Sequence, residues 1–481
     1  MARTDPLTDL PNCGTHRTPR ESTALSTAIP EPSPTPADEE RTRRSERRAW
    51  YMYDWAQSVF TTSVITVFLG PYLTTLAQNA AGAGDRISVL GWMITPASLY
   101  PYATSLSVLL QLVLLPALGA IADSSGRKRE LLGVTAYLGA FATMGLYFVH
   151  GDRYLLGAGL FVLANVAFGA SIVVANSFLP DIADEDERDA VSSRGWAMGY
   201  LGGALLLTLN LALFLGHERL GLEEGHAVRI CMVSAGVWWA VFTVIPLARL
   251  RNRRERSLRV PVRRISVGRS FTQLWQTVRS LRAYPRTLLF LVAYILFNDG
   301  IQTVIAFSAT FADQALGLGQ TVQIGTILMV QFVAFGGALL LGAIARRVGA
   351  KKAILGSLVV WTAVVAVAPV LQAGSAVQFF ALGFFIAIVL GGTQALSRSL
   401  FSQLIPRGKE AEYFGLYEIS DKGSAFLGAL VLGVVLDATG GDYRLAILSL
   451  IVFFVLGFVL LLTINIPAAI RDAGNRVPEK V

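Results

Sequence analysis

Acidic side chains stand inside long apolar stretches of this chain, where a charge is costly unless it has a use. Asp54 and Asp299 are each followed three residues later by a glutamine, Gln57 and Gln302. A carboxyl group in such a setting can exchange a proton or pair with a positive group of a bound solute. Asp299 lies roughly twelve residues into its block, about 18 Å along a helix, which is near mid-membrane. It is the first candidate for proton coupling, whereas the shallower Asp54 suits a central site or a gate.

A second charged group lies near the start of a later apolar block. Glu418 and Lys422 are four residues apart, with Asp421 between them. Residues at this spacing share one face of a helix, so Glu418 and Lys422 could form an ion pair. The pair is either structural, facing the interior of a helical bundle, or part of a transport site. Glu418 is the second candidate for proton coupling.

The composition predicts that these residues lie in membrane-spanning helices. Of the 481 residues, 53% are hydrophobic and only 15% are charged, whereas soluble domains carry about 25% charged residues. The apolar residues gather in blocks of about 20 or more, the length that spans a bilayer. We expect an all-α membrane protein with twelve spans, at residues 49–76, 99–122, 131–149, 154–178, 194–216, 227–248, 287–311, 322–345, 353–372, 376–400, 413–437 and 443–466.

The distribution of basic residues predicts the orientation of these spans. The N-terminal tail, two short turns and the stretch 249–286 are rich in arginine and lysine, whereas the loops between them are not. By the positive-inside rule, both termini and the middle loop lie in the cytoplasm, which requires an even number of spans. The net charge of +8 is explained by loops that face anionic lipid and implies no nucleic acid. We expect a multi-pass protein of a bacterial-type plasma membrane.

A repeated phrase indicates that the chain is duplicated. Residues 119–129 and 342–352 both begin with Gly-Ala-Ile-Ala, end a long apolar run and open a basic turn. Self-similarity at corresponding positions is the mark of a repeat. We therefore expect two six-helix halves, at 46–248 and 287–467. The remaining segments are a disordered cytoplasmic tail at 1–45, a basic linker with an amphipathic helix at 249–286 and a second cytoplasmic tail at 468–481.

The first copy of the phrase resembles the signature loop of major facilitator transporters. The matching residues are Gly119, Asp123, Gly126, Arg127 and Lys128. The resemblance implies two parallel six-helix halves with a substrate site between them near the midplane. It also implies that the loop acts as a cytoplasmic latch, in which the glycine at position 119 allows neighbouring helices to approach closely.

The resemblance assigns partners to the charges of this latch. Asp123 would face the N-terminal end of the eleventh span, where free N–H groups and the helix dipole favour an anion. Arg127 would pair with Asp181, the acid after the fourth span.

The second copy of the phrase departs from the pattern at its acidic position. It carries Arg346 there, which would meet a helix dipole of like sign if it were placed equivalently. We expect Arg346 to pair instead with an acid such as Glu410 or Glu412.

Longer segments resemble one branch of this superfamily, the vacuole-effluxer-like transporters. The segments that carry the resemblance are 48–58, 179–182, 193–200 and 414–418, and similarity extends over about 45–467. The branch is named for the autophagy-related vacuolar amino-acid effluxer of fungi. The resemblance implies a secondary active transporter that works by alternating access, with proton coupling and amino-acid efflux as the expectation. Export of another metabolite or of a drug is the alternative, and a non-transporting scaffold or a channel is the rival class.

Other classes of function find less support in the sequence. It has neither a Gly-rich phosphate loop of the Walker form nor a His/Cys cluster at metal-ligand spacing. Its two cysteines offer no disulfide framework. We therefore expect no enzyme activity, no cofactor and no metal. The expected partners are a small solute, protons and the lipid bilayer, with the monomer as the functional unit.

Overall fold

The computed structural model describes residues 36–81, 86–89, 91–252, 279, 281–423 and 425–480. Within these residues the fold is nearly all helical, which confirms the predicted all-α membrane protein. In this described part of the chain, eleven helical segments are long and apolar enough to cross a membrane: Ala37–Ala81, Pro96–Ser125, Lys128–Phe148, Tyr154–Ile182, Arg188–Leu215, Glu224–Arg249, Pro285–Gln314, Thr321–Val348, Ala350–Val370, Ala376–Gln403 and Tyr443–Thr463. Two shorter helices occupy the remaining predicted span, 413–437.

The N-terminal half contains the first six of these segments. Its elements are α1 (Pro36–Val59), the π-helix η1 (Phe60–Phe68), α2 (Leu69–Ala81), β1 (Ile87–Val89), β2 (Trp92–Ile94), η3 (Pro96–Ser98), α3 (Leu99–Ser125), α4 (Lys128–Gly145), η4 (Leu146–Phe148), α5 (Tyr154–Asn176), α6 (Leu179–Ile182), α7 (Arg188–Leu215), η5 (Glu218–Leu220) and α8 (Glu224–Arg249). The antiparallel strands β1 and β2 form a hairpin between the first and second spans.

The C-terminal half repeats this plan. Its elements are η6 (Leu281–Ala283), α10 (Pro285–Gln314), α11 (Gln320–Val348), α12 (Ala350–Val367), η7 (Ala368–Val370), α13 (Ala376–Gln403), α14 (Glu410–Gly423), α15 (Ala425–Thr439), α16 (Tyr443–Ser449), α17 (Ile451–Thr463) and α18 (Ile466–Asp472). The helices α14 and α15 together occupy the eleventh predicted span, and residue 424 between them lies outside the described residues.

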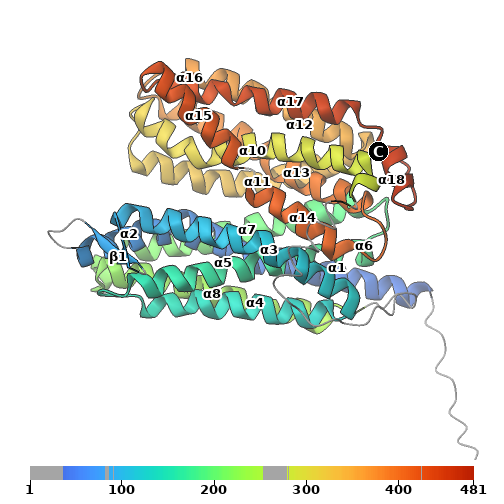
Figure 1. Ribbon diagram of the computed structural model, residues 1–481, viewed down its shortest axis with the longest axis horizontal. Coiled ribbons are helices and arrows are strands. Elements are labelled where there is room, and N and C mark those ends of the chain that lie inside the picture. Colours follow the sequence, from blue (N-terminus) through green and yellow to red (C-terminus); the bar gives the residue numbers. More distant parts are fainter. Residues whose placement is uncertain are drawn as a thin grey trace, which may run out of the picture. The chain divides into compact units, whose positions relative to one another are not determined.

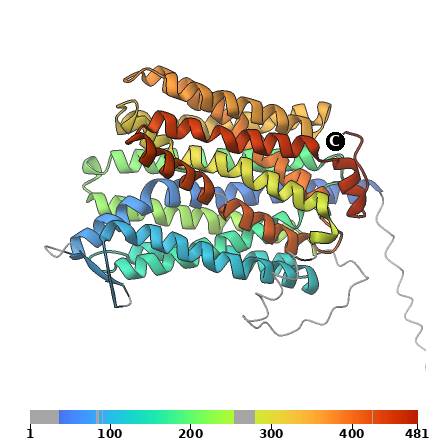
Figure 2. The ribbon, with the colours of Figure 1, turned by 45° about the horizontal axis from the view of Figure 1, so that its top comes forward.

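The two halves meet along a small set of helices. Within the halves, α4 packs on α5 and α8, and α11 packs on α13. Between the halves, α7 packs against α11 and α13, while α14 packs against α3 and α5. Figure 1 shows the two groups one above the other, with α1–α8 in blue to green and α10–α18 in yellow to red. Figure 2 shows the same helices running alongside one another, with the hairpin at the end of the bundle opposite to the C-terminus.

Glycines let the first and fifth spans approach closely. Gly195, Gly199 and Gly203 lie four residues apart on α7, and each faces α1 or η1. A Cβ added to Gly199 would lie 2.6 Å from Oγ of Ser58, and one added to Gly203 would lie 2.5 Å from Oγ1 of Thr62. Small residues allow such contact where hydrophobic collapse does not hold helices together.

The outer surface of the bundle is apolar, as lipid contact requires. Leu209 is 61% exposed, Val434 is 60% exposed and Leu462 is 55% exposed, each on a different helix. A soluble protein rarely exposes contiguous apolar surface on this scale. The interior holds a continuous core with large side chains from both halves, including Trp239 and Trp361, which are fully buried.

The tails and the linker differ in part from the sequence-based expectation. Helix α1 begins at Pro36, so residues 36–45, which we expected in the N-terminal tail, are helical. Part of the expected C-terminal tail is also ordered, because α18 covers Ile466–Asp472 and Asn475 is hydrogen-bonded to the bundle. The amphipathic helix expected within 249–286 and the first 35 residues of the tail lie outside the described residues.

Candidate functional site

The two repeated turns lie at one end of the bundle, which we call the basic end. In the first turn, α3 ends at Ser125, Gly126 takes a left-handed conformation with φ 62°, and α4 begins at Lys128. A residue with a side chain is strained at this φ, whereas glycine is not. Figure 1 shows α6 and α18 at the same end of the bundle.

Asp123 joins the halves at the basic end. Its Oδ1 accepts a hydrogen bond of 3.0 Å from the backbone N–H of Ala411, and its Oδ2 accepts one of 2.9 Å from Glu412. Both donors lie in the first turn of α14, where N–H groups have no partner within the helix. The carboxylate therefore lies at the positive end of that helix dipole, as the resemblance implied.

Gly119 makes this contact possible. A Cβ at position 119 would overlap the carbonyl oxygen of Ala411. One turn further along α14, a Cβ on Gly415 would lie 3.1 Å from the carbonyl oxygen of Leu115. Helices α3 and α14 thus touch backbone to backbone at the basic end.

The partner expected for Asp181 was wrong by one residue. Lys128, and not Arg127, forms the ion pair with Asp181, at 3.0 Å, and it also donates to the carbonyl oxygen of Ser177. Because the glycine turn ends the preceding helix, α4 begins at Lys128 and this side chain points into the bundle. Arg127, at the N-cap of α4, is exposed.

The pairing expected for Arg346 is also wrong. Arg346 is exposed, and the described residues give it no ion pair with Glu410 or Glu412. Glu410 instead accepts a hydrogen bond from the backbone N–H of Gly408. Arg346 occupies the last turn of α11, where a cation interacts favourably with the negative end of its own helix.

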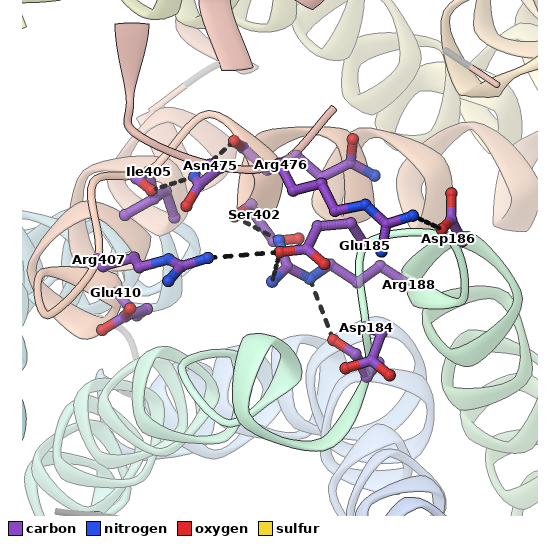
Figure 3. A network of polar contacts seen from close by, with 12 residues as sticks. Asp184, Glu185, Asp186, Arg188, Ser402, Ile405, Arg407, Glu410, Asn475 and Arg476 are labelled. Atoms are coloured by element: carbon purple, nitrogen blue, oxygen red, sulfur yellow. Dashed lines mark hydrogen bonds and ion pairs between the residues drawn. The ribbon is translucent and has the colours of Figure 1, made fainter. Parts of the chain in front are cut away.

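A polar cavity of about 300 Å³ separates the halves at the basic end, near the loop between α6 and α7. Figure 3 shows the charged side chains that line it. Glu185 lies 3.9 Å from both Arg188 of the N-terminal half and Arg407 of the C-terminal half. Arg188 also donates to the carbonyl oxygen of Ser402 at 3.3 Å. One acid thus bridges arginines from both halves.

The segment after α18 crosses this region. Asn475 donates from Nδ2 to the carbonyl oxygens of Gln403 and Ile405, both at 2.8 Å. Asp186, in the loop of the other half, accepts from the backbone N–H of Glu479 at 2.7 Å and lies 3.4 Å from Arg476. Figure 3 shows Asn475 beside Ile405 and the side chain of Arg476 reaching to Asp186. The C-terminal segment therefore contacts both halves.

Asp54 forms a buried ion pair across the halves. Its Oδ2 lies 3.2 Å from the guanidinium of Arg398 on α13, and Gln57 lies 3.5 Å from its other oxygen. Arg398 also bonds the side chain and carbonyl oxygen of Ser192 and the side chain of Asn176. Sequence reasoning missed Arg398, although a charge inside the apolar block 376–400 was the signal for it.

Asp299 lies beside the eleventh span. It is fully buried on α10, and the backbone amides of Leu427 and Gly428 on α15 lie next to its carboxyl group. Neither carboxylate oxygen completes a hydrogen bond of normal geometry within the described residues. Burial of an ionised carboxyl group in this state is costly.

Asp421 accepts hydrogen bonds from polar side chains of α10. Its Oδ1 accepts from Oη of Tyr294 and Nδ2 of Asn298, both at 3.0 Å, and Nε2 of Gln302 lies at 3.5 Å. Asp421 is half-buried and lies two residues before the end of α14. Asp421 is visible in the sequence between Glu418 and Lys422. The spacing of those residues does not predict that Asp421 contacts Gln302, which is 119 residues away.

The predicted pair of Glu418 with Lys422 falls on a side chain, that of Lys422, which lies outside the described residues. Glu418 itself is buried, with 4% exposure. The candidate residues fall into two groups. Asp123, Lys128 and Asp181 belong to the basic end, while Asp299, Asp421 and Gln302 lie where α10 meets the eleventh span.

The chain matches a known protein family over nearly its whole length. The model of the family described as "Vacuole effluxer Atg22 like" matches residues 42–474. A protein of Bacillus subtilis named "Uncharacterized MFS-type transporter YxiO" is 29% identical over 419 residues, which cover 86% of this chain and 94% of that protein. "Autophagy-related protein 22" of Pyricularia oryzae is 28% identical over 505 residues, which cover 84% of this chain and 74% of that protein.

Solved structures share the fold at low sequence identity. The proton:xylose symporter XylE superposes with a TM-score of 0.65 and 11% identity, over 87% of this chain and 95% of that chain. FucP, a major facilitator transporter in the outward conformation, superposes with a TM-score of 0.60 and 13% identity, over 88% of this chain and 99% of that chain. These likenesses confirm the predicted fold, and the family match confirms the predicted branch.

Proposed function

Because the chain belongs to the Atg22-like vacuole effluxer family of major facilitator transporters, we propose that it moves a small solute by proton-coupled alternating access. The observation that carries the proposal is a fully buried acid, Asp299, inside a membrane-spanning helix. Ionisable groups at such positions are costly and mark substrate or proton pathways in transporters.

The contacts at the basic end support alternating access. Asp123 bonds the first turn of α14, and Asp54 pairs with Arg398, so the halves are joined there by charges that separate when the halves move apart. Charged groups that stabilise one of two arrangements set the population of each. We propose that this conformation is closed at the cytoplasmic side and opens there in the next step of the cycle.

The surroundings of Asp299 support a role in proton coupling. The side chain is fully buried next to Leu427 and Gly428 of α15, so a change in its charge changes the stability of the contact between α10 and α15. Protonation lowers the cost of burial, whereas the ionised form is stabilised by nearby backbone amides. A proton would thus alter the geometry of the eleventh span, which is in contact with both halves.

Transport in proteoliposomes tests this function. The purified protein should show saturable counterflow of a labelled solute, and a panel of amino acids, other metabolites and drugs should identify which solutes exchange. A non-transporting scaffold would move none of them. Asp299→Asn should abolish accumulation driven by a pH gradient while solute exchange continues. Uphill transport by Asp299→Asn would exclude this acid and leave Glu418 as the candidate.

The distribution of basic residues supports cytoplasmic termini in a bacterial-type plasma membrane. Reporter fusions test this orientation independently of transport. Fusions at Gly221 and Gly317 should report the outer side, and fusions at Ser257 and Gly408 should report the cytoplasm. A reversed signal at any of these positions would contradict the assignment of spans.

A further inference from the structure

We propose that α1 and α8 form a binding site for one anionic phospholipid at the basic end of the bundle. The phosphate would lie between the guanidinium groups of Arg48 and Arg249, and an acyl chain would occupy the apolar groove beside them. The site is separate from Asp299 and from the charges that join the halves, so the proposal does not depend on the transport function.

A groove of about 390 Å³ lies between the two helices. Asn252, just after α8, accepts a hydrogen bond from the backbone N–H of Arg129 and donates one to Glu130, so the groove belongs to the basic end. Its volume is within the range of about 300–1,000 Å³ that is usual for small-molecule sites. Its apolar lining consists of Ala49, Met52, Val244, Ile245 and Ala248.

The polar lining of the groove is one exposed arginine from each helix, Arg48 and Arg249. Arg47, the neighbour of Arg48, is paired with Glu187. Within the described part of the chain, by contrast, Arg48 and Arg249 make neither a hydrogen bond nor an ion pair, and no acidic side chain lines the groove. Guanidinium groups bind phosphate with two parallel hydrogen bonds, so this arrangement favours a phosphate-bearing anion.

The two arginines lie at the depth of lipid headgroups. Arg48 directly precedes the apolar block 49–76, and Arg249 directly follows the block 227–248. Val244, deeper in the groove, is 54% exposed, which suits contact with an acyl chain and not with water. A phospholipid matches both parts of the groove, whereas a free phosphate would contact only the arginines. Basic pockets between spanning helices are the usual sites for anionic headgroups.

Aromatic rings close the groove on the side of the membrane interior. Trp55 stacks on Trp238 with ring centroids 5.3 Å apart, and Phe242 lies 4.7 Å from Trp238. Nε1 of Trp238 also donates to the carbonyl oxygen of Trp55 at 3.3 Å. Trp55 lies about one turn beyond Met52, and Phe242 about one turn beyond Ile245. The helices are therefore held together below the groove, and a site with a shape fixed in advance loses less free energy on binding.

Native mass spectrometry of the purified full-length protein tests the site, because it counts the lipids that stay bound. Palmitoyl-oleoyl-phosphatidylglycerol and palmitoyl-oleoyl-phosphatidylcholine carry the same acyl chains, but only the first has a net negative charge. Glycerol phosphate offers the phosphate without the chains and is added as a competitor. Titration with each lipid gives its apparent affinity, and size-exclusion chromatography verifies that each variant is folded.

Two variants separate the charge of the groove from its shape. Arg48→Gln/Arg249→Gln removes both cations, and Arg346→Gln/Arg347→Gln is its control, because it removes two exposed arginines from the end of α11. Ala248→Trp fills the groove but keeps both of its arginines.

The control for the filled groove is Val134→Trp. It adds the same ring at a position on α4 that is 66% exposed and does not line the groove.

We expect wild type to bind one phosphatidylglycerol roughly 10- to 30-fold more tightly than phosphatidylcholine, as two arginines at an anionic surface predict. Arg48→Gln/Arg249→Gln should bind the two lipids alike, Ala248→Trp should lose the tight phosphatidylglycerol, and both controls should match wild type. Equal binding of the two lipids by wild type would overturn the proposal, as would an equal loss in Arg346→Gln/Arg347→Gln.

Two further outcomes would overturn it in different ways. Unchanged binding of phosphatidylglycerol by Ala248→Trp would assign the preference to exposed charge and not to the groove. Displacement of the lipid by an equal concentration of glycerol phosphate would assign the arginines to a soluble phosphate ester.

Discussion

Asp54 and Arg398 are 344 residues apart in sequence, and their side chains form an ion pair of 3.2 Å between the two halves of the protein. The side chain of Arg398 is 4% exposed, and its guanidinium lies 4.6 Å from the ring of Trp50 and 5.6 Å from that of Trp196. The side chain of Asp54 is only 12% exposed, so both charges are largely buried. A movement that separates α1 from α13 must therefore hydrate or neutralise both groups.

Arg398→Gln is expected to destabilise this conformation strongly. Removal of one partner of a buried pair leaves the other charge uncompensated, at a cost of about 3–5 kcal/mol. The double variant Asp54→Asn/Arg398→Gln should be more stable than Arg398→Gln alone, since it leaves no buried charge. Thermal unfolding in detergent measures both effects. If the effects of Asp54→Asn and of Arg398→Gln on thermal unfolding simply add in the double variant, the two side chains do not stabilise one another.

Asp123→Asn is expected to open the basic end without unfolding the protein. The variant loses the interaction of a carboxylate with the first turn of α14, which is worth up to about 2 kcal/mol in a partly buried site. A cysteine placed at Ala183, a buried position that lines the polar cavity, should then react faster with a maleimide, in a background without the two native cysteines. Glu130→Gln, an exposed acid on α4, is the control. Equal labelling rates in both variants would leave Asp123 without a role in the gate.

The sequence predicted most of the spans and the contact of Asp123 with α14, because both depend on local patterns. A block of about 20 apolar residues forms a helix that spans the bilayer. The turn at 119–129 contains the glycine, the acid and the cations that identify it. The predicted partner of Asp181 was Arg127, whereas the observed partner is the next residue, Lys128. The two side chains point in different directions. The helix that begins after Gly126 rotates neighbouring side chains by about 100° per residue, so only the structure could tell which cation enters the bundle.

The central residues could not be paired from the sequence alone. Arg398 and Asp421 were visible as charges near or within apolar blocks, but their partners Asp54 and Tyr294 lie in other spans. Periodicity places a residue on a helix face and does not say which helix that face meets.

Gly119→Ala is expected to prevent full closure of the basic end. The added Cβ would overlap the carbonyl oxygen of Ala411, and a backbone atom cannot move aside as the tip of a flexible side chain can. Gly159→Ala is the matched control, since it lies on α5 with open space around the new methyl group. It should stabilise the helix by up to about 1 kcal/mol. The cysteine of Ala183→Cys should be labelled faster in Gly119→Ala than in the control Gly159→Ala. Identical labelling rates in Gly119→Ala and Gly159→Ala would contradict the importance of the close contact.

Asn475→Ala is expected to release the C-terminal segment from the bundle. The side chain makes two hydrogen bonds of 2.8 Å, to the carbonyl oxygens of Gln403 and Ile405, and their loss should cost about 1–3 kcal/mol. Hydrogen exchange over residues 466–480 should become faster in this variant. Arg476→Gln removes only a pair between exposed groups at the same place, which contributes about 0–1 kcal/mol, so its exchange should stay close to that of wild type.

The variants Asn475→Ala and Arg476→Gln also test whether the C-terminal segment holds the two halves together. Because the segment contacts Asp186 of one half and the carbonyl oxygens of the other, its release should make the basic end open more often. Labelling of Ala183→Cys should then rise in Asn475→Ala together with hydrogen exchange. Faster exchange with unchanged labelling would show that the segment covers the cavity without holding the halves together.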